Sequence, residues 1–142
     1  MSVRQQVHII DDDPGVLEST GFLLRLEGFD VRTFGSALDF LNAVKLGDKG
    51  CILTDMRMPV MTGIDLLLKV TERRLLLPVI VMSAEADFRL VKRAMELGAV
   101  GFIVKPFDAD TLLASIEKAL AVNESRCEDV DAAKLILAGA AL

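Results

Sequence analysis

Short apolar runs alternate along the chain with longer segments in which apolar residues recur every three or four positions. This alternation predicts strands that are each followed by a helix, and therefore an α/β fold with a parallel sheet. Some of the runs contain no alternating polar residue, which is typical of parallel strands that are buried on both faces. The five predicted strands cover residues 7–10, 30–34, 51–54, 78–82 and 101–104.

Five helices are predicted in the segments that follow these strands. Asp13 is a suitable N-cap for the first helix, with Pro14 near its first position, and Ser36 is the expected cap of the second. Gly28 and Gly98 stand where a helix usually ends. The predicted helices cover about residues 14–27, 36–44, 62–73, 87–97 and 108–122.

The chain changes character after residue 122. Residues 123–131 are polar, and residues 131–142 are rich in Ala and Leu. This predicts one domain over residues 1–122, followed by a linker and a short helix or a frayed tail over residues 123–142. An extension of the last helix is a further alternative. The last eight residues are apolar, and such a segment usually packs on something.

Composition narrows the class of protein. The 142 residues suffice for one domain with a core that needs neither disulfides nor a structural metal. The net charge of −5 does not favour binding of nucleic acid or of an anionic membrane by the residues present. No apolar run could span a bilayer, and Cys51 and Cys127 lack the spacing of a metal site. We therefore expect a cytoplasmic protein with free thiols.

Polar residues that could carry chemistry stand where the predicted strands end. Asp11 and Asp12 follow the first strand, Asp55 the third, Ser83 the fourth and Lys105 the fifth. Because the carboxyl ends of parallel strands share one edge of a sheet, these side chains should converge there. Three neighbouring carboxylates repel one another unless a cation neutralises them, and oxygen ligands suit Mg²⁺, or Mn²⁺, better than Zn²⁺.

Asp55 is the best candidate for a nucleophile in this group, because it ends the middle strand. The expected arrangement has the metal on one side of Asp55 and Lys105 on the other. A carboxylate placed there can attack a phosphorus atom, while the metal and the ammonium group stabilise the charge of the transition state.

Four segments at these strand ends carry a resemblance to a known family. They are residues 10–13 (IDDD), 53–63 (LTDMRMPVMTG), 82–84 (MSA) and 102–107 (FIVKPF). With these motifs in this order, residues 5–122 resemble the receiver domains of two-component response regulators. The amino-acid sequences of the segments are most similar to those of FixJ-like regulators, which carry a LuxR-type helix-turn-helix output domain.

The resemblance implies a flavodoxin-like, doubly wound sheet of five parallel strands in the order 2-1-3-4-5, flanked by five helices. It implies that Asp55 is the phosphoacceptor and that Mg²⁺ is bound by Asp12 directly and by Asp11 largely through water. It further implies that the backbone carbonyl of Arg57 is a metal ligand and that Ser83, Ala84 and Lys105 contact the phosphoryl oxygens. Phe102 is the implied aromatic switch, and the peptide bond between Lys105 and Pro106 is expected to be cis.

The implied partner is a sensor histidine kinase that supplies the phosphoryl group. A homodimer through the fourth helix, fifth strand and fifth helix is expected on phosphorylation, and a monomer at rest is equally consistent with the family. We expect DNA to be bound by an output domain beyond residue 142 rather than by this domain. The alternative is a stand-alone receiver that relays phosphoryl groups or docks on a protein.

The same residues are open to other functional and structural interpretations. A magnesium-dependent phosphatase with an Asp nucleophile would have a second acid two positions later, where this chain has Arg57. A flavin-binding protein would have a phosphate-binding loop after the first strand rather than three acids. Taken singly, the acids at 11–13 fit a helix N-terminus, Ser83 a turn cap, Lys105 a solvated loop, Phe102 the core and His8 a strand.

Overall fold

Five parallel strands form one sheet in the order β2-β1-β3-β4-β5, as the resemblance implied. The computed structural model describes residues 5–85 and 87–140. The strands are β1 (Gln6–Ile10), β2 (Asp30–Phe34), β3 (Cys51–Asp55), β4 (Val79–Ser83) and β5 (Gly101–Val104). The helices are α1 (Pro14–Leu26), α2 (Ala37–Ala43), α3 (Gly63–Glu72), α4 (Phe88–Glu96) and α5 (Ala109–Ala140).

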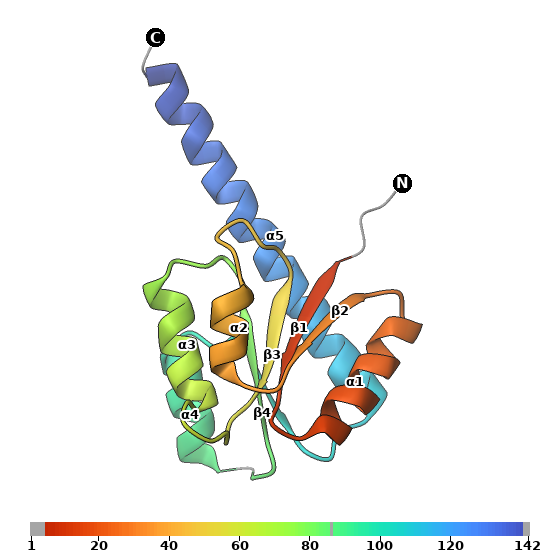
Figure 1. The fold of residues 1–142 in the computed structure, drawn as a ribbon. Coiled ribbons are helices and arrows are strands. Elements are labelled where there is room, and N and C mark those ends of the chain that lie inside the picture. Colours follow the sequence, from red (N-terminus) through yellow and green to blue (C-terminus); the bar gives the residue numbers. More distant parts are fainter. Residues whose placement is uncertain (1–4, 86, 141–142) are drawn as a thin grey trace.

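Helices cover both faces of the sheet (Figure 1). Alternate residues of one strand therefore enter different clusters. Ile52 and Val81 pack with residues of α2, α3 and α4, whereas Leu53 and Ile80 pack with residues of α1 and α5. This two-sided burial explains why the strands are apolar at nearly every position.

Side-chain caps begin several helices close to the predicted positions. The Asp13 carboxylate accepts a hydrogen bond from the Gly15 amide at 2.9 Å, and the Ser36 hydroxyl accepts one from the Asp39 amide at 3.1 Å. Thr62 and Asp65 form a capping box at the start of α3. Each cap fixes where the chain turns from the edge of the sheet into the next helix.

The predicted end of the last helix near residue 122 is wrong. α5 continues without a break to Ala140, so the alternative of an extended helix is the one observed. The physical reason is that residues 107–138 contain neither Gly nor Pro, so that polar residues there continue the helix on its solvated side. Of the predicted apolar ending, Ala141 and Leu142 lie outside the described residues.

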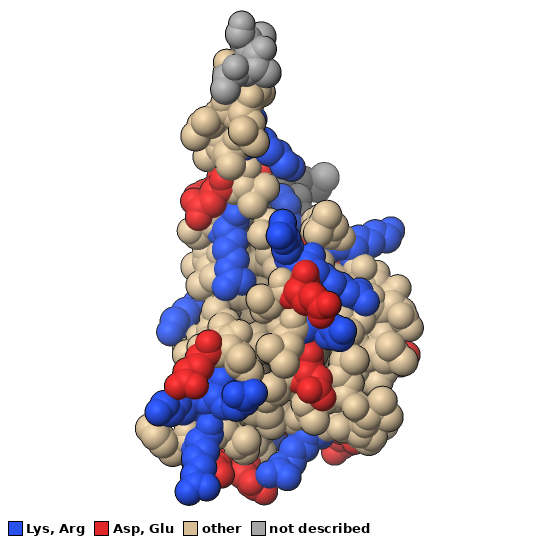
Figure 2. All heavy atoms as spheres, turned by 90° about the vertical axis from the view of Figure 1, so that its left-hand side faces the viewer, with Lys and Arg blue, Asp and Glu red and all other residues tan. Residues whose placement is uncertain are grey.

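The two ends of the sheet differ. All five strands are parallel, so their carboxyl ends share one edge, at the bottom of Figure 1. The extension of α5 leaves the body at the opposite end, and it stands clear of the body in Figure 2 as well. None of the helices within the described residues has both the length and the apolar composition needed to cross a membrane.

Candidate functional site

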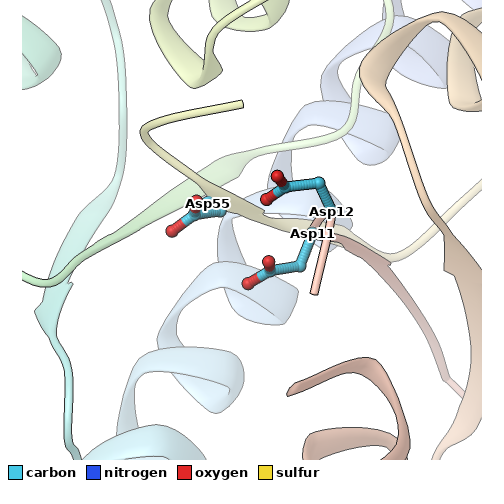
Figure 3. A group of neighbouring side chains, drawn as sticks. All are labelled: Asp11, Asp12 and Asp55. Carbon is cyan, nitrogen blue, oxygen red and sulfur yellow. The ribbon is translucent and has the colours of Figure 1, made fainter. Parts of the chain in front are cut away.

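Three carboxylates gather at the carboxyl edge of the sheet. Asp11 and Asp12 directly follow β1, and Asp55 is the last residue of the neighbouring strand β3. One carboxylate oxygen from each of the three lies within 4.8 Å of the others (Figure 3). Asp11 and Asp55 are buried, with 1% and 9% of their surface exposed, whereas Asp12 is exposed. The sequence therefore correctly predicted that these acids converge.

Lys105 joins this group from the end of β5. Its Nζ lies 2.7 Å from Asp11 Oδ2 and 2.9 Å from Asp55 Oδ1. We expected Lys105 to lie on the side of Asp55 away from the acidic pair. Instead, its ammonium group bridges Asp11 and Asp55. The Lys105 amide donates to the Ser83 carbonyl at 2.7 Å, and the peptide bond from Lys105 to Pro106 is cis.

The charges of the group do not balance. Burial raises the pKa of Asp55, the hydrogen bond from Lys105 opposes this, and the negative charge of Asp11 raises the pKa further. Burial alone would lower the pKa of Lys105, but its hydrogen bonds to Asp11 and Asp55 outweigh that effect and raise it. One ammonium group thus faces three carboxyl groups, and the charged form of Asp55 is less favourable than that of a solvated carboxylate.

The donor set fits a divalent cation that prefers oxygen ligands. The three acids can each direct one oxygen to a common point, and a cation there would relieve the repulsion between Asp11 and Asp55. The acidic cluster is therefore compatible with Mg²⁺.

A second set of contacts links the loops after β3 and β4. Arg57 Nη2 lies 3.0 Å from Glu85 Oε2, and both side chains are largely exposed. The Glu85 amide donates to the hydroxyl of Ser83 at 3.1 Å. Ser83 is thus buried beside the acidic group at the next strand end, with its hydroxyl engaged by its own loop.

The remaining predicted residues lie around this group without joining it. Phe102 is partly buried against the cluster that contains α4, so its position fits the core as well as a switch. Ala84 is exposed directly after Ser83, and the carbonyl of Arg57 stays a predicted ligand.

Two features of this edge were missed in the sequence. Glu85 stands two residues after the end of β4, as Arg57 stands two residues after the end of β3, and this symmetry of opposite charges could have indicated the ion pair. Val60 adopts a positive φ of 68°, and the Met61 amide donates to the Pro59 carbonyl at 2.7 Å. This is a γ-turn of the rare positive-φ kind, which a valine at position 60 does not signal.

Comparisons with known proteins agree with this geometry. Residues 7–117 match a family model described as the response regulator receiver domain. The chain is 37% identical over 138 residues to the transcriptional regulatory protein FixJ of Bradyrhizobium diazoefficiens, and the aligned region covers 93% of this chain and 67% of FixJ. It is 40% identical over 121 residues to the response regulator protein TodT of Pseudomonas putida, and the aligned region covers 84% of this chain and 53% of TodT.

Solved structures show the same fold. The crystal structure of FixJ-N has a TM-score of 0.79 at 36% identity, and the match covers 84% of this chain and 96% of that one. The structure of the response regulator StyR has a TM-score of 0.88 at 36% identity, with 94% of this chain and 67% of that one covered. The chain spans between about half and two thirds of the length of the curated relatives named above.

Proposed function

Since this chain belongs to the response regulator receiver domain family, we propose that it is switched by transfer of a phosphoryl group onto Asp55. The observation that supports this most strongly is the position of Asp55, whose carboxyl group lies within reach of two acids and of Lys105. A nucleophilic carboxylate, a group that can hold a divalent cation and an ammonium group are what phosphoryl transfer requires.

In the proposed reaction, a carboxylate oxygen of Asp55 attacks the phosphorus atom of a phosphohistidine on a sensor kinase. A P–O bond to Asp55 forms, the P–N bond breaks, and the electron pair leaves with the imidazole nitrogen, which then takes up a proton. Lys105 offers its ammonium protons to the phosphoryl oxygens. When bound by Asp11, Asp12, Asp55 and the carbonyl of Arg57, Mg²⁺ would supply the positive charge that offsets the developing negative charge.

The new charge on Asp55 would alter the loop after β4. The Ser83 hydroxyl now accepts a hydrogen bond from the Glu85 amide, and on phosphorylation it would turn to donate to a phosphoryl oxygen. A movement of this loop would reach α4 directly, because Asp87 caps that helix. With Phe102 turning inward, the face formed by α4, β5 and α5 would change shape.

That face is also the proposed site of a homodimer. Phe88 and Met95 of α4 are 77% and 44% exposed, and Val104 of the edge strand β5 is 38% exposed. Apolar side chains in these positions favour association once the loop has moved.

The output of the switch is proposed from the relatives, of which FixJ is a transcriptional regulator. We propose that the kinase and this domain meet in the cytoplasm, and that DNA is bound by an output domain rather than by the receiver. A receiver that docks on another protein or relays phosphoryl groups is the alternative. The apolar side chains of Leu135, Ile136 and Leu137, each at least 70% exposed on α5, suit a contact in either case.

The proposal is tested with acetyl phosphate as donor. With Mg²⁺ the chain should gain one phosphoryl group in its intact mass, and a chelator should prevent this. Asp55→Asn should abolish the gain in mass, because the amide has no negatively charged oxygen to act as nucleophile. Asp39 is an exposed acid on α2, and the Asp39→Asn variant should be labelled normally.

Two results would overturn the proposal. Labelling of Asp55→Asn at the rate of the unchanged chain would show that another residue is the acceptor. Repeated turnover of a phosphomonoester, with no stable label on the protein, would show an enzyme rather than a phosphoacceptor.

A further inference from the structure

Asn123 is a polar side chain buried in the middle of α5, with 6% of its surface exposed. Its Oδ1 accepts a hydrogen bond from the Gly50 amide at 3.0 Å, and its Nδ2 donates to the Leu76 carbonyl at 3.0 Å. Gly50 directly precedes β3 and Leu76 lies between α3 and β4. One side chain of α5 therefore joins two loops at the edge of the sheet opposite to Asp55.

The geometry of Gly50 makes this link specific. Gly50 has a φ of +110°, and a Cβ there would lie 2.0 Å from the Gln6 carbonyl oxygen. The backbone of Gly50 is thus held against β1, and its amide has a fixed direction toward α5. An apolar side chain at position 123 would leave this buried amide and the Leu76 carbonyl without their partner.

Asn123 is also the last buried residue of α5 within the described part of the chain. On one side of the helix beyond it, a cavity of about 660 Å³ separates residues such as Cys127 and Asp131 from Gln5 and Lys49. Figures 1 and 2 show the extension leaving the body without a neighbouring element.

We infer that Asn123 is a positioning residue that fixes the direction in which the α5 extension leaves the receiver body, so that the extension is a rigid lever. Residues 124–139 form roughly 24 Å of helix at about 1.5 Å per residue. A change of about 10° in direction at Asn123 would therefore move the tip by about 4 Å. Apolar packing of Leu120 alone allows small rotations, because dispersion contacts are not directional, whereas two hydrogen bonds to separate loops oppose them.

Distances between spin labels on the body and on the tip test this inference. Suitable label sites are the exposed residues Leu38 on α2 and Leu137 on α5, each changed to Cys in a Cys127→Ser background. Cys51 is buried, and burial raises the pKa of its thiol to about 12, so it should not react with the label. The unchanged Asn123 should give one narrow distance distribution.

Asn123→Leu and Asn123→Ser should each broaden that distribution at least about twofold, or shift its mean by several ångströms, with helix content by circular dichroism retained. Glu124→Ala, on the same turn but exposed, should leave the distribution unchanged. Labelling of Asp55 by acetyl phosphate should also keep its rate in both Asn123 variants, because the link lies at the far edge of the sheet.

A folded Asn123 variant with the distribution of the unchanged chain would overturn the inference, and packing alone would then position α5. The unchanged chain offers a second test that needs no substitution at position 123. The Gly50 amide should exchange its hydrogen at least about a hundredfold more slowly than the amide of Gly47 in the same loop. Equal exchange rates would show that the link to Asn123 does not hold in solution.

Discussion

At the level of single residues, position in the sheet decides what Asp55 can do. The neighbouring acid Asp11 and burial both raise the pKa of Asp55, and Lys105 offsets only part of this effect. A carboxylate in this environment is stabilised by a bound cation. The residue types could be identified in the sequence, but the bridge from Lys105 to both acids could not, because it depends on the rotamer of one long side chain.

The loop that follows Asp55 is strained at Val60. A β-branched residue at a positive φ costs about 1–3 kcal/mol, and its side chain is fully exposed, so no packing offsets the cost. We predict that Val60→Gly raises the free energy of unfolding by about 1 kcal/mol in urea denaturation. Val104→Gly, in an ordinary strand, should instead lower it, and a lower stability for Val60→Gly would contradict the proposed strain.

His8 makes the stability depend on pH. Burial lowers its pKa from the ordinary value of 6.5, while its Nε2 donates to the Lys49 carbonyl at 3.2 Å and its Nδ1 has no partner among the described residues. Below pH 6.5 the unfolded chain takes up a proton that the folded chain resists, so stability falls as the pH falls toward the folded pKa.

Because of this proton, the free energy of unfolding should decline by up to about 1.4 kcal/mol per pH unit between about pH 6.5 and the folded pKa. Urea denaturation over this range, compared with His8→Leu, isolates the contribution. The difference in stability between the two proteins should shift with pH in favour of His8→Leu as the pH falls. A constant difference would show that His8 does not titrate differently in the two states.

At the level of elements, apolar runs and cap residues were enough to place all five strands and the starts of most helices. Ser36, for example, caps the second helix as expected, and the third helix begins next to Thr62, close to its predicted start. The end of α5 was not predictable in this way, because residues such as Glu124 and Arg126 suit a solvated helix as well as a linker. The role of Asn123 was hidden for another reason, since Gly50 and Leu76 are its partners only in the folded chain.

The start of α3 packs directly against Asp55. A Cβ at Gly63 would lie 2.5 Å from the Asp55 carbonyl oxygen, and the Gly63 amide donates to the Met56 carbonyl at 2.9 Å. We predict that Gly63→Ala displaces the end of β3, lowers the free energy of unfolding by at least about 1 kcal/mol and slows labelling of Asp55 by acetyl phosphate.

Gly35→Ala is the matched control, because a Cβ there meets nothing within 4 Å. Its stability and its labelling rate should stay close to those of the unchanged chain. If Gly63→Ala also labels at the normal rate, the close approach of α3 does not position Asp55 for phosphorylation.

At the level of the whole molecule, the site and the extension of α5 lie at opposite ends of the sheet (Figure 1). No described residue after Asn123 is buried, so the last part of α5 contributes little to the core. Removal of residues 132–142 should change the free energy of unfolding by less than about 1 kcal/mol and leave phosphorylation intact. A loss of more than about 2 kcal/mol in urea denaturation would show that the extension packs on the body.

The central claim is that Asp55 itself becomes an acyl phosphate, and chemical trapping tests it most directly. The chain is treated with acetyl phosphate and Mg²⁺, reduced with borohydride, digested and sequenced by mass spectrometry. We predict that the reduced residue is found at position 55 alone, because Asp55 ends the middle strand of the sheet and its carboxyl group lies within reach of the acidic pair and of Lys105. Reduction at Asp11 or Asp12, or a phosphoryl group that resists borohydride on Ser83, would contradict this account.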